Sequence, residues 1–261
     1  MVWILKKTTL KSLPDFYNHP AIKFFFKLSI ENDFNTWIVG GAVRDHLIGR
    51  DVNDIDFVSD LEPKKMLEIF QKHEVQFEDT FFHYGTLVVN LFNKRYFITS
   101  LREDYDYDGR HSKIKFTKEL SVDAKRRDLT INSLYLNKNG EIIDFFNGID
   151  DIDNSKLIFI NGIKQKCFED HLRIIRYIRF CSMFKNPFIP NEYKKFFVKN
   201  SFMVKKVNKK KWIYEIKKIF ENEFFLNSVL LFKDLKIVDY IFEKVLIHET
   251  NLKKELCIFF K

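Results

Sequence analysis

The sequence predicts a mixed α+β protein in which a sheet-containing N-terminal domain is followed by an all-helical C-terminal domain. Over residues 1–146, short runs of β-branched and aromatic residues alternate with helical patterns. Over 147–261, strand patterns nearly vanish and apolar residues recur every three to four positions, which is the period of a helix with one buried face. One such stripe comprises Leu172, Ile175, Phe180 and Met183.

The individual elements follow from local patterns in chain order. Helices are predicted over 18–32, 42–48, 63–72 and 121–127. Strands are predicted over 36–39 and 55–58, with two hairpins over 86–101 and 132–145. The polar and acidic run 102–118 is expected to form a long mobile loop.

Composition excludes several classes of protein. Of the 261 residues, 46% are hydrophobic and 31% charged, which excludes disordered and fibrous classes. No run reaches the ~18 to 20 consecutive apolar residues of a membrane span, and the N-terminus lacks the pattern of a secretory signal. The three cysteines, Cys167, Cys181 and Cys257, are never CxxC-spaced, so neither a disulfide framework nor a zinc site is expected. We therefore expect a reducing, cytoplasmic location.

Charge is divided unevenly along the chain. Residues 1–150 contain 21 Lys and Arg against 23 Asp and Glu, whereas 151–261 contain 23 against 13. The formal net charge of +8 therefore comes entirely from the C-terminal part. This division is typical of a protein that holds cations with one part and a polyanion such as nucleic acid with the other. A solvated, lysine-rich helical surface explains the charge equally well.

The strongest local pattern is WIVGGAVRDHLIGRDVNDIDFVSD, residues 37–60. A strand leads into Gly40-Gly41, where backbone N–H groups can approach a phosphate at the start of a helix. A second strand is predicted to carry Asp54 and Asp56, whose i, i+2 spacing places both carboxylates on one face. Such carboxylates repel each other unless a cation lies between them, and Mg²⁺ with a nucleoside triphosphate fits this chemistry. The alternative is a surface strand with acidic residues beside an ordinary glycine turn.

Five sequence blocks occur in the order and spacing of a known family. They are GGAVRD (40–45), DIDF (54–57), RRDLTINSL (126–134), DFFNGIDDI (144–152) and EDHLRIIRYIRF (169–180). On these blocks the chain resembles the class II tRNA nucleotidyltransferases and bacterial poly(A) polymerases. The resemblance implies a nucleotidyltransferase catalytic head with a small mixed sheet over 1–146, and a helical neck with a shortened body over 147–261. It also implies an enzyme that adds CCA to the 3′ end of tRNA from CTP and ATP and releases pyrophosphate.

The resemblance also assigns roles to individual residues. Asp54 and Asp56 match the catalytic, metal-binding pair, which would hold two Mg²⁺ ions that activate the RNA 3′-hydroxyl and neutralise the leaving pyrophosphate. Asp128 would accept a hydrogen bond from a ribose 2′-hydroxyl, which favours NTP over dNTP. The residues matched to nucleotide binding are Gly40, Gly41, Arg44, Arg127, Asp128, Asn132, Asp170, Arg173 and Arg176.

Asp170 and Arg173 match the pair that acts in this family as a protein template for the incoming base. A carboxylate accepts from an exocyclic amine and a guanidinium donates to the adjacent ring nitrogen, a pattern that C and A share. U and G present the opposite pattern and would leave buried polar groups unpaired. The alternative is an ordinary i, i+3 helix ion pair.

The sequence also departs from the family pattern. His171 stands where relatives usually have proline, so it either lengthens the helix or is neutral, and Phe97 stands where many place a third acidic residue. The block 208–211 reads Asn-Lys-Lys-Lys in place of the usual Ser-x-Glu-Arg. The resemblance also implies that most of the tRNA-gripping tail of relatives is missing, so we expect RNA binding to rely on lysines. These are Lys205, Lys206, Lys209, Lys210 and Lys211.

Several functions remain open within and beyond the family. The acidic run 102–118 is similar to the flexible loop of relatives that add the terminal A, which favours complete CCA addition. An A-adding enzyme of a split CC/A system and a poly(A) polymerase are the nearest alternatives. An inactive RNA-binding relative is the alternative from another class of protein. The sequence makes no prediction of oligomeric state.

Overall fold

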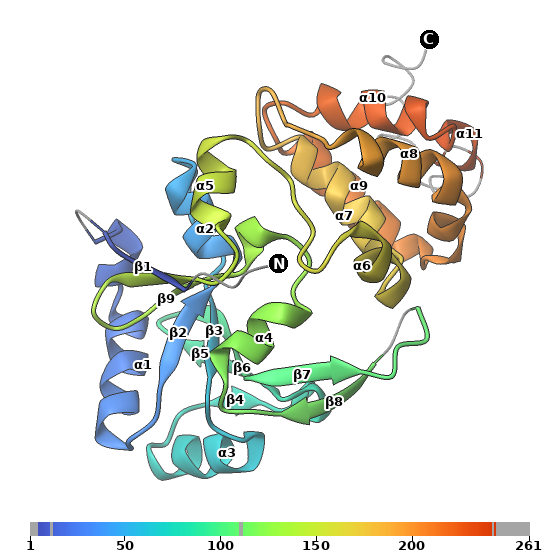
Figure 1. Ribbon diagram of the computed structural model, residues 1–261. Coiled ribbons are helices and arrows are strands. Elements are labelled where there is room, and N and C mark those ends of the chain that lie inside the picture. The colour runs from blue at the N-terminus through green and yellow to red at the C-terminus, as the bar shows by residue number, and fades with distance from the viewer. Residues whose placement is uncertain (1–4, 11–12, 110–111, 242, 244–261) are drawn as a thin grey trace. The chain divides into compact units, whose positions relative to one another are not determined.

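The computed structural model describes residues 5–10, 13–109, 112–241 and 243, which divide into two compact units (Figure 1). The first unit comprises Met1–Asp106 and Lys113–Asp153, and the second comprises Tyr107–Ser112 and Asn154–Lys261. The predicted boundary after residue 146 therefore falls too early, because helix α5, Gly148–Asp153, packs with the first unit.

A mixed sheet forms the centre of the first unit. In the described part of the chain it has eight strands in the order β1-β10-β9-β2-β3-β6-β5-β4, and β3 pairs with β6 in parallel while the other pairs are antiparallel. Its strands are β1 Lys6–Thr9, β2 Thr36–Val39, β3 Asp56–Ser59, β4 Phe77–Glu78, β5 Thr86–Leu91, β6 Lys94–Ser100, β9 Leu134–Leu136 and β10 Glu141–Asp144. The sheet is larger than predicted, because the sequence patterns missed β1 and β4 at its two edges.

Helices pack against this sheet through an aromatic core. The helices of the first unit are α1 Pro20–Glu31, α2 Gly41–Leu47, α3 Pro63–Lys72, α4 Leu120–Arg126 and α5. Phe25 of α1 lies 4.7 Å from Phe57 of β3 between ring centroids, and both rings are buried. Tyr96 of β6 joins them, 5.9 Å from the ring of Phe25. Burying three aromatic side chains together anchors α1 against the middle of the sheet.

The expected mobile loop over 102–118 is wrong. Two strands, β7 Arg102–Tyr105 and β8 Lys113–Phe116, form a separate antiparallel pair. Glu103 lies opposite Lys115 in its register, and the Nζ of Lys113 lies 2.7 Å from the carboxylate of Asp106. Cross-strand pairs of opposite charge therefore stabilise strands in a sequence that looks too polar for them.

The second unit is helical, as predicted. Its helices are α6 Ile163–Glu169, α7 Leu172–Cys181, α8 Asn191–Asn200, α9 Lys209–Phe220, α10 Leu226–Asp234 and α11 Val238–Tyr240. The predicted stripe on α7 is only partly right, because Leu172 and Met183 are half-exposed and the helix ends at Cys181. Its buried face is formed by Ile174, Ile175, Tyr177, Ile178 and Cys181.

A buried ion pair joins two of these helices. Glu215 of α9 is 2% exposed, and its Oε2 lies 2.9 Å from the Nε of Arg179 of α7. At the start of α9, the side chain of Asn208 accepts a hydrogen bond of 2.8 Å from the backbone N–H of Lys210. Asparagine thus keeps the helix cap in the block where the family pattern is otherwise lost.

The two described cysteines lie in the helices of the second unit. Cys167 and Cys181 are free and buried, and burial raises the pKa of the Cys167 thiol to about 12. Cys257 lies outside the described residues. Among the helices that the structure describes, none is both long enough and apolar enough to cross a bilayer.

Asp144 provides a test of how α5 is held to the first unit. Its carboxylate is fully buried and accepts hydrogen bonds of 3.0 Å from the backbone N–H groups of Phe146, Gly148 and Ile149. We expect Asp144→Ala to lower the free energy of unfolding by about 2–4 kcal/mol, because it leaves buried donors without an acceptor. Urea titration measures this change. The matched control is Asp150→Ala, which breaks an exposed pair with Lys6 and should cost under about 1 kcal/mol. An equal loss of unfolding free energy in both variants would contradict the role of Asp144 in holding α5.

Candidate active site

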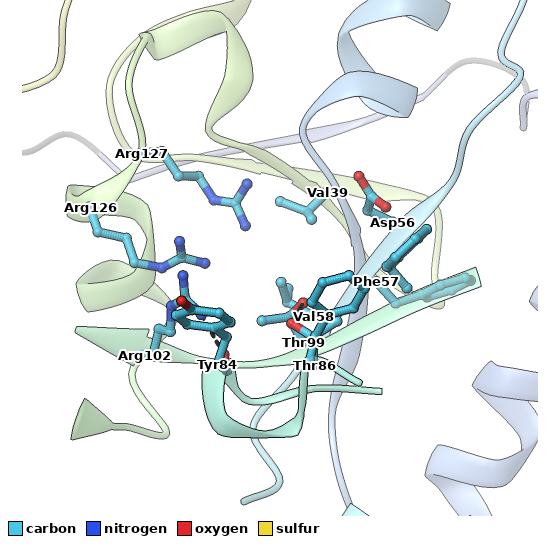
Figure 2. Close-up of a pocket in the computed structure, with 12 residues that line it drawn as sticks. Val39, Asp56, Phe57, Val58, Tyr84, Thr86, Thr99, Arg102, Arg126 and Arg127 are labelled. Atoms are coloured by element: carbon cyan, nitrogen blue, oxygen red, sulfur yellow. Dashed lines mark hydrogen bonds between the residues drawn. The ribbon is translucent and has the colours of Figure 1, made fainter. Parts of the chain in front are cut away.

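A pocket of about 430 Å³ opens on the first unit at the ends of β2 and β3. Figure 2 shows Asp56 on one side of this pocket and the guanidinium groups of Arg126 and Arg127 on the other. Arg102 and the ring of Tyr84 lie at its lower edge in this view. The pocket thus brings a carboxylate and three arginines around one space large enough for part of a nucleotide.

Asp56 is the first residue of β3, and its backbone is flanked by Val39 of β2 and Phe97 of β6. Asp54 lies in the preceding loop, so the prediction that one strand carries both carboxylates is wrong. The two groups nevertheless interact. Partial removal from water raises the pKa of Asp56 above 3.8, Arg127 lowers it, and repulsion from Asp54 raises it further. A nearby cation would relieve this strain on the ionised pair.

The pair fits a divalent cation that is completed by substrate oxygens. In the described residues no three His, Cys, Asp or Glu side chains come together as a complete metal cage. In the strand register Phe97 pairs with Asp56. Phe97 is the residue that stands where the resemblance implies a third acidic residue in many relatives. Mg²⁺ is commonly bound through one or two carboxylates together with substrate phosphates, and Asp54 and Asp56 can supply those carboxylates.

The arginine side of the pocket is organised by Asp123, which the sequence reasoning missed. Asp123 of α4 has no exposed surface, and its two oxygens accept from Arg126 Nε at 2.8 Å and Arg127 Nε at 3.1 Å. The hydroxyl of Tyr135 donates to the same carboxylate at 2.9 Å. Burial alone would raise the pKa of Asp123, but the two guanidinium groups and these hydrogen bonds lower it to about 2. The i, i+3 and i, i+4 spacing from Asp123 to the two arginines was the signal in the sequence.

The base of the β7–β8 hairpin contributes the third arginine. Nε of Arg102 lies 3.0 Å from Oδ1 of Asp104, and the Nη1 group of Arg102 donates to the backbone carbonyl of Tyr84. Oδ2 of Asp104 also lies 3.8 Å from Nη1 of Arg126. Loss of water and repulsion from Arg126 lower the pKa of Arg102. The carboxylates of Asp104 and Asp123 therefore hold a concentrated positive charge in place at the pocket.

The diglycine lies at the junction of β2 and α2, as predicted, but the N–H of Gly40 is engaged within the fold. Gly40 has φ of +69°, a conformation that favours glycine, and a Cβ there would lie 3.4 Å from the carbonyl oxygen of Asn132. Its N–H donates to the carbonyl of Leu134 at 3.0 Å, so this N–H is engaged in the fold and does not point to a phosphate. Gly41 begins α2 directly after it.

Arg44, Asn132 and Asp128 meet in a buried chain of hydrogen bonds. The Nη1 group of Arg44 donates to the side-chain oxygen of Asn132, whose amide donates to Asp128 at 2.9 Å. Arg44 also binds Asp45 at 2.8 Å. The structure brings these three predicted residues together, and their roles toward a nucleotide remain predictions.

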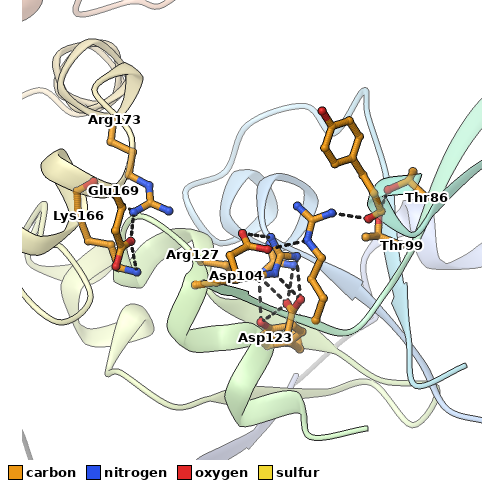
Figure 3. Close-up of polar contacts among 12 residues, drawn as sticks. Thr86, Thr99, Asp104, Asp123, Arg127, Lys166, Glu169 and Arg173 are labelled. Carbon is orange, nitrogen blue, oxygen red and sulfur yellow. Dashed lines mark hydrogen bonds and ion pairs between the residues drawn. The ribbon is translucent and has the colours of Figure 1, made fainter. Parts of the chain in front are cut away.

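In the second unit, Asp170 and Arg173 lie at the junction of α6 and α7. Asp170 directly follows α6 as its C-cap, and its Oδ1 accepts from the backbone N–H of Leu172 at 3.0 Å. The Nη1 group of Arg173 donates to the carboxylate of Glu169 and, at 3.2 Å, to the carbonyl of Lys166. Glu169 also pairs with the buried amine of Lys166 at 3.0 Å (Figure 3). The sequence reasoning missed Glu169, although its i, i+4 spacing to Arg173 was visible.

A small pocket of about 120 Å³ in the second unit lies next to Asp170. Gly109 from the hairpin tip accepts a hydrogen bond of 3.2 Å from the backbone N–H of His171 there. His171 precedes α7, so it does not lengthen the helix. The five predicted RNA-binding lysines, Lys205, Lys206, Lys209, Lys210 and Lys211, are all exposed, and Lys206 and Lys211 line this pocket. The guanidinium of Arg176 lies 5.4 Å above the ring of Phe180.

The mixed sheet, with Asp56 facing an arginine cluster at its pocket, fits a nucleotidyltransferase head. Residues 36–158 match the family model described as the poly A polymerase head domain. This part of the chain is similar to that head domain, which agrees with the resemblance seen in the sequence blocks.

Known relatives agree with this assignment. The human "CCA tRNA nucleotidyltransferase 1, mitochondrial" is 40% identical over 161 residues, which cover 61% of this chain and 37% of that protein. The crystal structure of the Bacillus stearothermophilus CCA-adding enzyme in complex with CTP matches with a TM-score of 0.75 and 25% identity, covering 89% of this chain and 56% of that one. A tRNA nucleotidyltransferase complexed with a primer tRNA and an incoming ATP analog matches with a TM-score of 0.69 and 25% identity, over 87% of this chain and 65% of that one. The chain thus spans well under two thirds of the human relative's length.

The buried charge of Asp123 predicts how stability changes with pH. Its pKa of about 2 in the folded protein lies below the ordinary value of 3.8, so the ionised carboxylate stabilises the fold above pH ~4. We expect Asp123→Asn to lower the free energy of unfolding at pH 7 by about 2 kcal/mol or more. The difference from the wild type should shrink as pH falls from ~4 toward 2. Denaturant unfolding at several pH values measures it.

The matched control is Glu119→Gln, which removes one negative charge from the exposed start of the same helix. This variant should stay within about 0.5 kcal/mol of the wild type. A pH-independent difference between Asp123→Asn and the wild type would contradict the ionised carboxylate as the source of stability.

Proposed function

We propose that this protein adds CCA to the 3′ end of tRNA from CTP and ATP, without a nucleic-acid template and with release of pyrophosphate. The observation that carries the proposal is the pocket in which Asp56, close to Asp54, faces Arg126 and Arg127. It lies within the segment that matches the poly A polymerase head domain. The activities named for the relatives supply the substrate class.

Carboxylates and arginines have different roles in the proposed nucleotidyl transfer. Asp54 and Asp56 would hold Mg²⁺, which supplies charge stabilisation to the attacking 3′-hydroxyl and the leaving pyrophosphate when bound. Enzymes of this family generally use divalent metal ions, and the choice of Mg²⁺ is part of the proposal. Arg126 and Arg127, fixed by Asp123, meet the negative charge of the triphosphate without having to reorganise. Asp128 would accept the ribose 2′-hydroxyl.

The incoming base would be read in the second unit. Glu169 fixes the orientation of Arg173, so its guanidinium presents donors in a defined direction. The Asp170 carboxylate would accept from the amine of C or A. Arg176, on the same helix, belongs to the proposed nucleotide site.

The exposed lysines of the second unit would hold the RNA. Lys206 and Lys211 line the small pocket that also contains Asp170. Three further exposed lysines are their neighbours in the sequence: Lys205, Lys209 and Lys210. Lys209, Lys210 and Lys211 lie in the first turn of α9, where their positive charge opposes the helix dipole. This position favours a role in binding an anion. The expected cytoplasmic location stays a prediction, since one relative is named as mitochondrial.

One observation favours a second candidate. Phe97 lies beside Asp56 in the strand register. The resemblance implies a third acidic residue at this position in many relatives. A chain that binds RNA but no longer transfers nucleotides would tolerate that exchange. The A-adding and poly(A)-adding alternatives have no such observation in their favour.

The test uses tRNA transcripts that end at the discriminator base, at C, and at CC. Each is incubated with CTP, with ATP and with both, in the presence of Mg²⁺. We expect products ending in CCA from all three transcripts when both nucleotides are present, and no product after Asp56→Asn. Addition of A alone to the CC transcript would indicate a split system, and long A tails would indicate a poly(A) polymerase. RNA binding without any product would favour the inactive relative.

Base choice gives a sharper prediction. Asp170→Asn keeps an oxygen that can cap Leu172, but it replaces an obligate acceptor with an amide that can also donate. We expect discrimination against UTP and GTP to fall by roughly 10- to 100-fold, as one polar contact is worth ~1–3 kcal/mol. Ratios of kcat/KM for the four nucleotides measure this. Equal loss for all four would assign Asp170 to the helix junction alone.

A further inference from the structure

Three aromatic side chains remain exposed around the pocket that contains Asp56. Phe81, Tyr84 and Phe97 are 41%, 43% and 37% exposed, and all three line the pocket. The ring centroids of Phe81 and Phe97 lie 6.4 Å apart. We call these three side chains the aromatic surface. Exposed rings gathered at a polar pocket are typical of a surface that a ligand covers.

Phe97 lies beside Asp56 on the neighbouring strand. It pairs directly with Asp56 in the parallel register of β3 and β6, and adjacent strands are about 4.8 Å apart. Along β6 the flanking residues Tyr96 and Ile98 point to the core and are each 3% exposed. Because side chains alternate along a strand, Phe97 stands on the opposite face, toward the pocket.

The rest of the aromatic surface is held in place by the fold. The short helix η2, Phe82–Tyr84, ends at Gly85 in the left-handed conformation. The backbone carbonyl of Tyr84 accepts a hydrogen bond from Arg102 (Figure 2). The aromatic surface therefore combines fixed ring faces with the positive charge of Arg102, which suits a nucleotide better than an apolar ligand.

We propose that the aromatic surface, and Phe97 above all, stacks the 3′-terminal base of the RNA that is being extended. This inference rests on the proposed function, in which the RNA 3′-hydroxyl must reach Asp54 and Asp56. The incoming base is assigned to Asp170 and Arg173, so a base platform beside Asp56 serves the other substrate. The terminal base also changes as CCA is built, from the discriminator to C and then C. Stacking accepts every base, because each has a π-face.

The experiment compares two RNAs that differ only at the last nucleotide. One tRNA transcript ends in C, and the other carries an abasic 3′-terminal nucleotide. Equilibrium binding to the full chain is measured without nucleoside triphosphate for the wild type, Phe97→Ala and Phe97→Tyr. We expect Phe97→Ala to weaken binding of the first RNA by roughly 10-fold or more. It should leave binding of the abasic RNA unchanged, and Phe97→Tyr should bind both RNAs like the wild type.

Kinetics and a control separate stacking from scaffolding. Phe97→Ala should raise the KM for the RNA primer while the KM for CTP stays unchanged. The matched control is Phe92→Ala, which removes an aromatic side chain, 57% exposed, from the β5–β6 turn outside the pocket lining. It should bind both RNAs like the wild type.

The possible outcomes also distinguish this inference from the proposed function. If Phe97→Ala binds both RNAs like the wild type, or loses affinity for both equally, the stacking inference is wrong even when CCA addition is observed. If the wild type adds no nucleotide but Phe97→Ala shows the base-dependent loss, the stacking inference stands and the proposed function is wrong.

Discussion

The rest of the pocket depends on the pairing of the buried Asp123 carboxylate with Arg126 and Arg127. Arg126 and Arg127 lie next to each other with little water to screen their charges, and such groups are stable only when paired. Asp123 binds both, and the hydroxyl of Tyr135 donates to the same carboxylate oxygen as Arg127. The arginines are thereby fixed before any ligand arrives. Preorganised charge of this kind stabilises developing negative charge more effectively than flexible side chains do.

The opposite side of the pocket has the reverse design. Burial raises the pKa of Asp56, and repulsion between Asp54 and Asp56 raises it further. Arg127 opposes this shift only in part, because it already binds Asp123 and Tyr135. The buried ion pairs therefore lie on the arginine side of the pocket, whereas the charges of Asp54 and Asp56 on the other side are not fully compensated. Strain left at one place in a well-satisfied structure is typical of a functional site.

The sequence predicted most elements of the first unit but not its edges. The strand 36–39 and the helix 63–72 match β2 and α3 residue for residue, because their signals are local. The edge strand β1 pairs with β10, more than a hundred residues away, and its four residues carry no pattern of their own. The hairpin of β7 and β8 was missed for a related reason. Its cross-strand pairs, such as Glu103 opposite Lys115, are visible only once the register is known.

The candidate site was predicted by residue type better than by geometry. The sequence identified Asp170 and Arg173 but left open whether they form an ion pair with each other. The structure gives Arg173 the neighbouring Glu169 as a partner, while Asp170 caps the first turn of α7. A guanidinium has five N–H donors, so a carboxylate bound at one edge fixes its orientation and leaves other donors for a ligand. A simple i, i+3 ion pair would need no Glu169. The use of a second carboxylate to fix Arg173 therefore favours a role for Asp170 and Arg173 in reading a base.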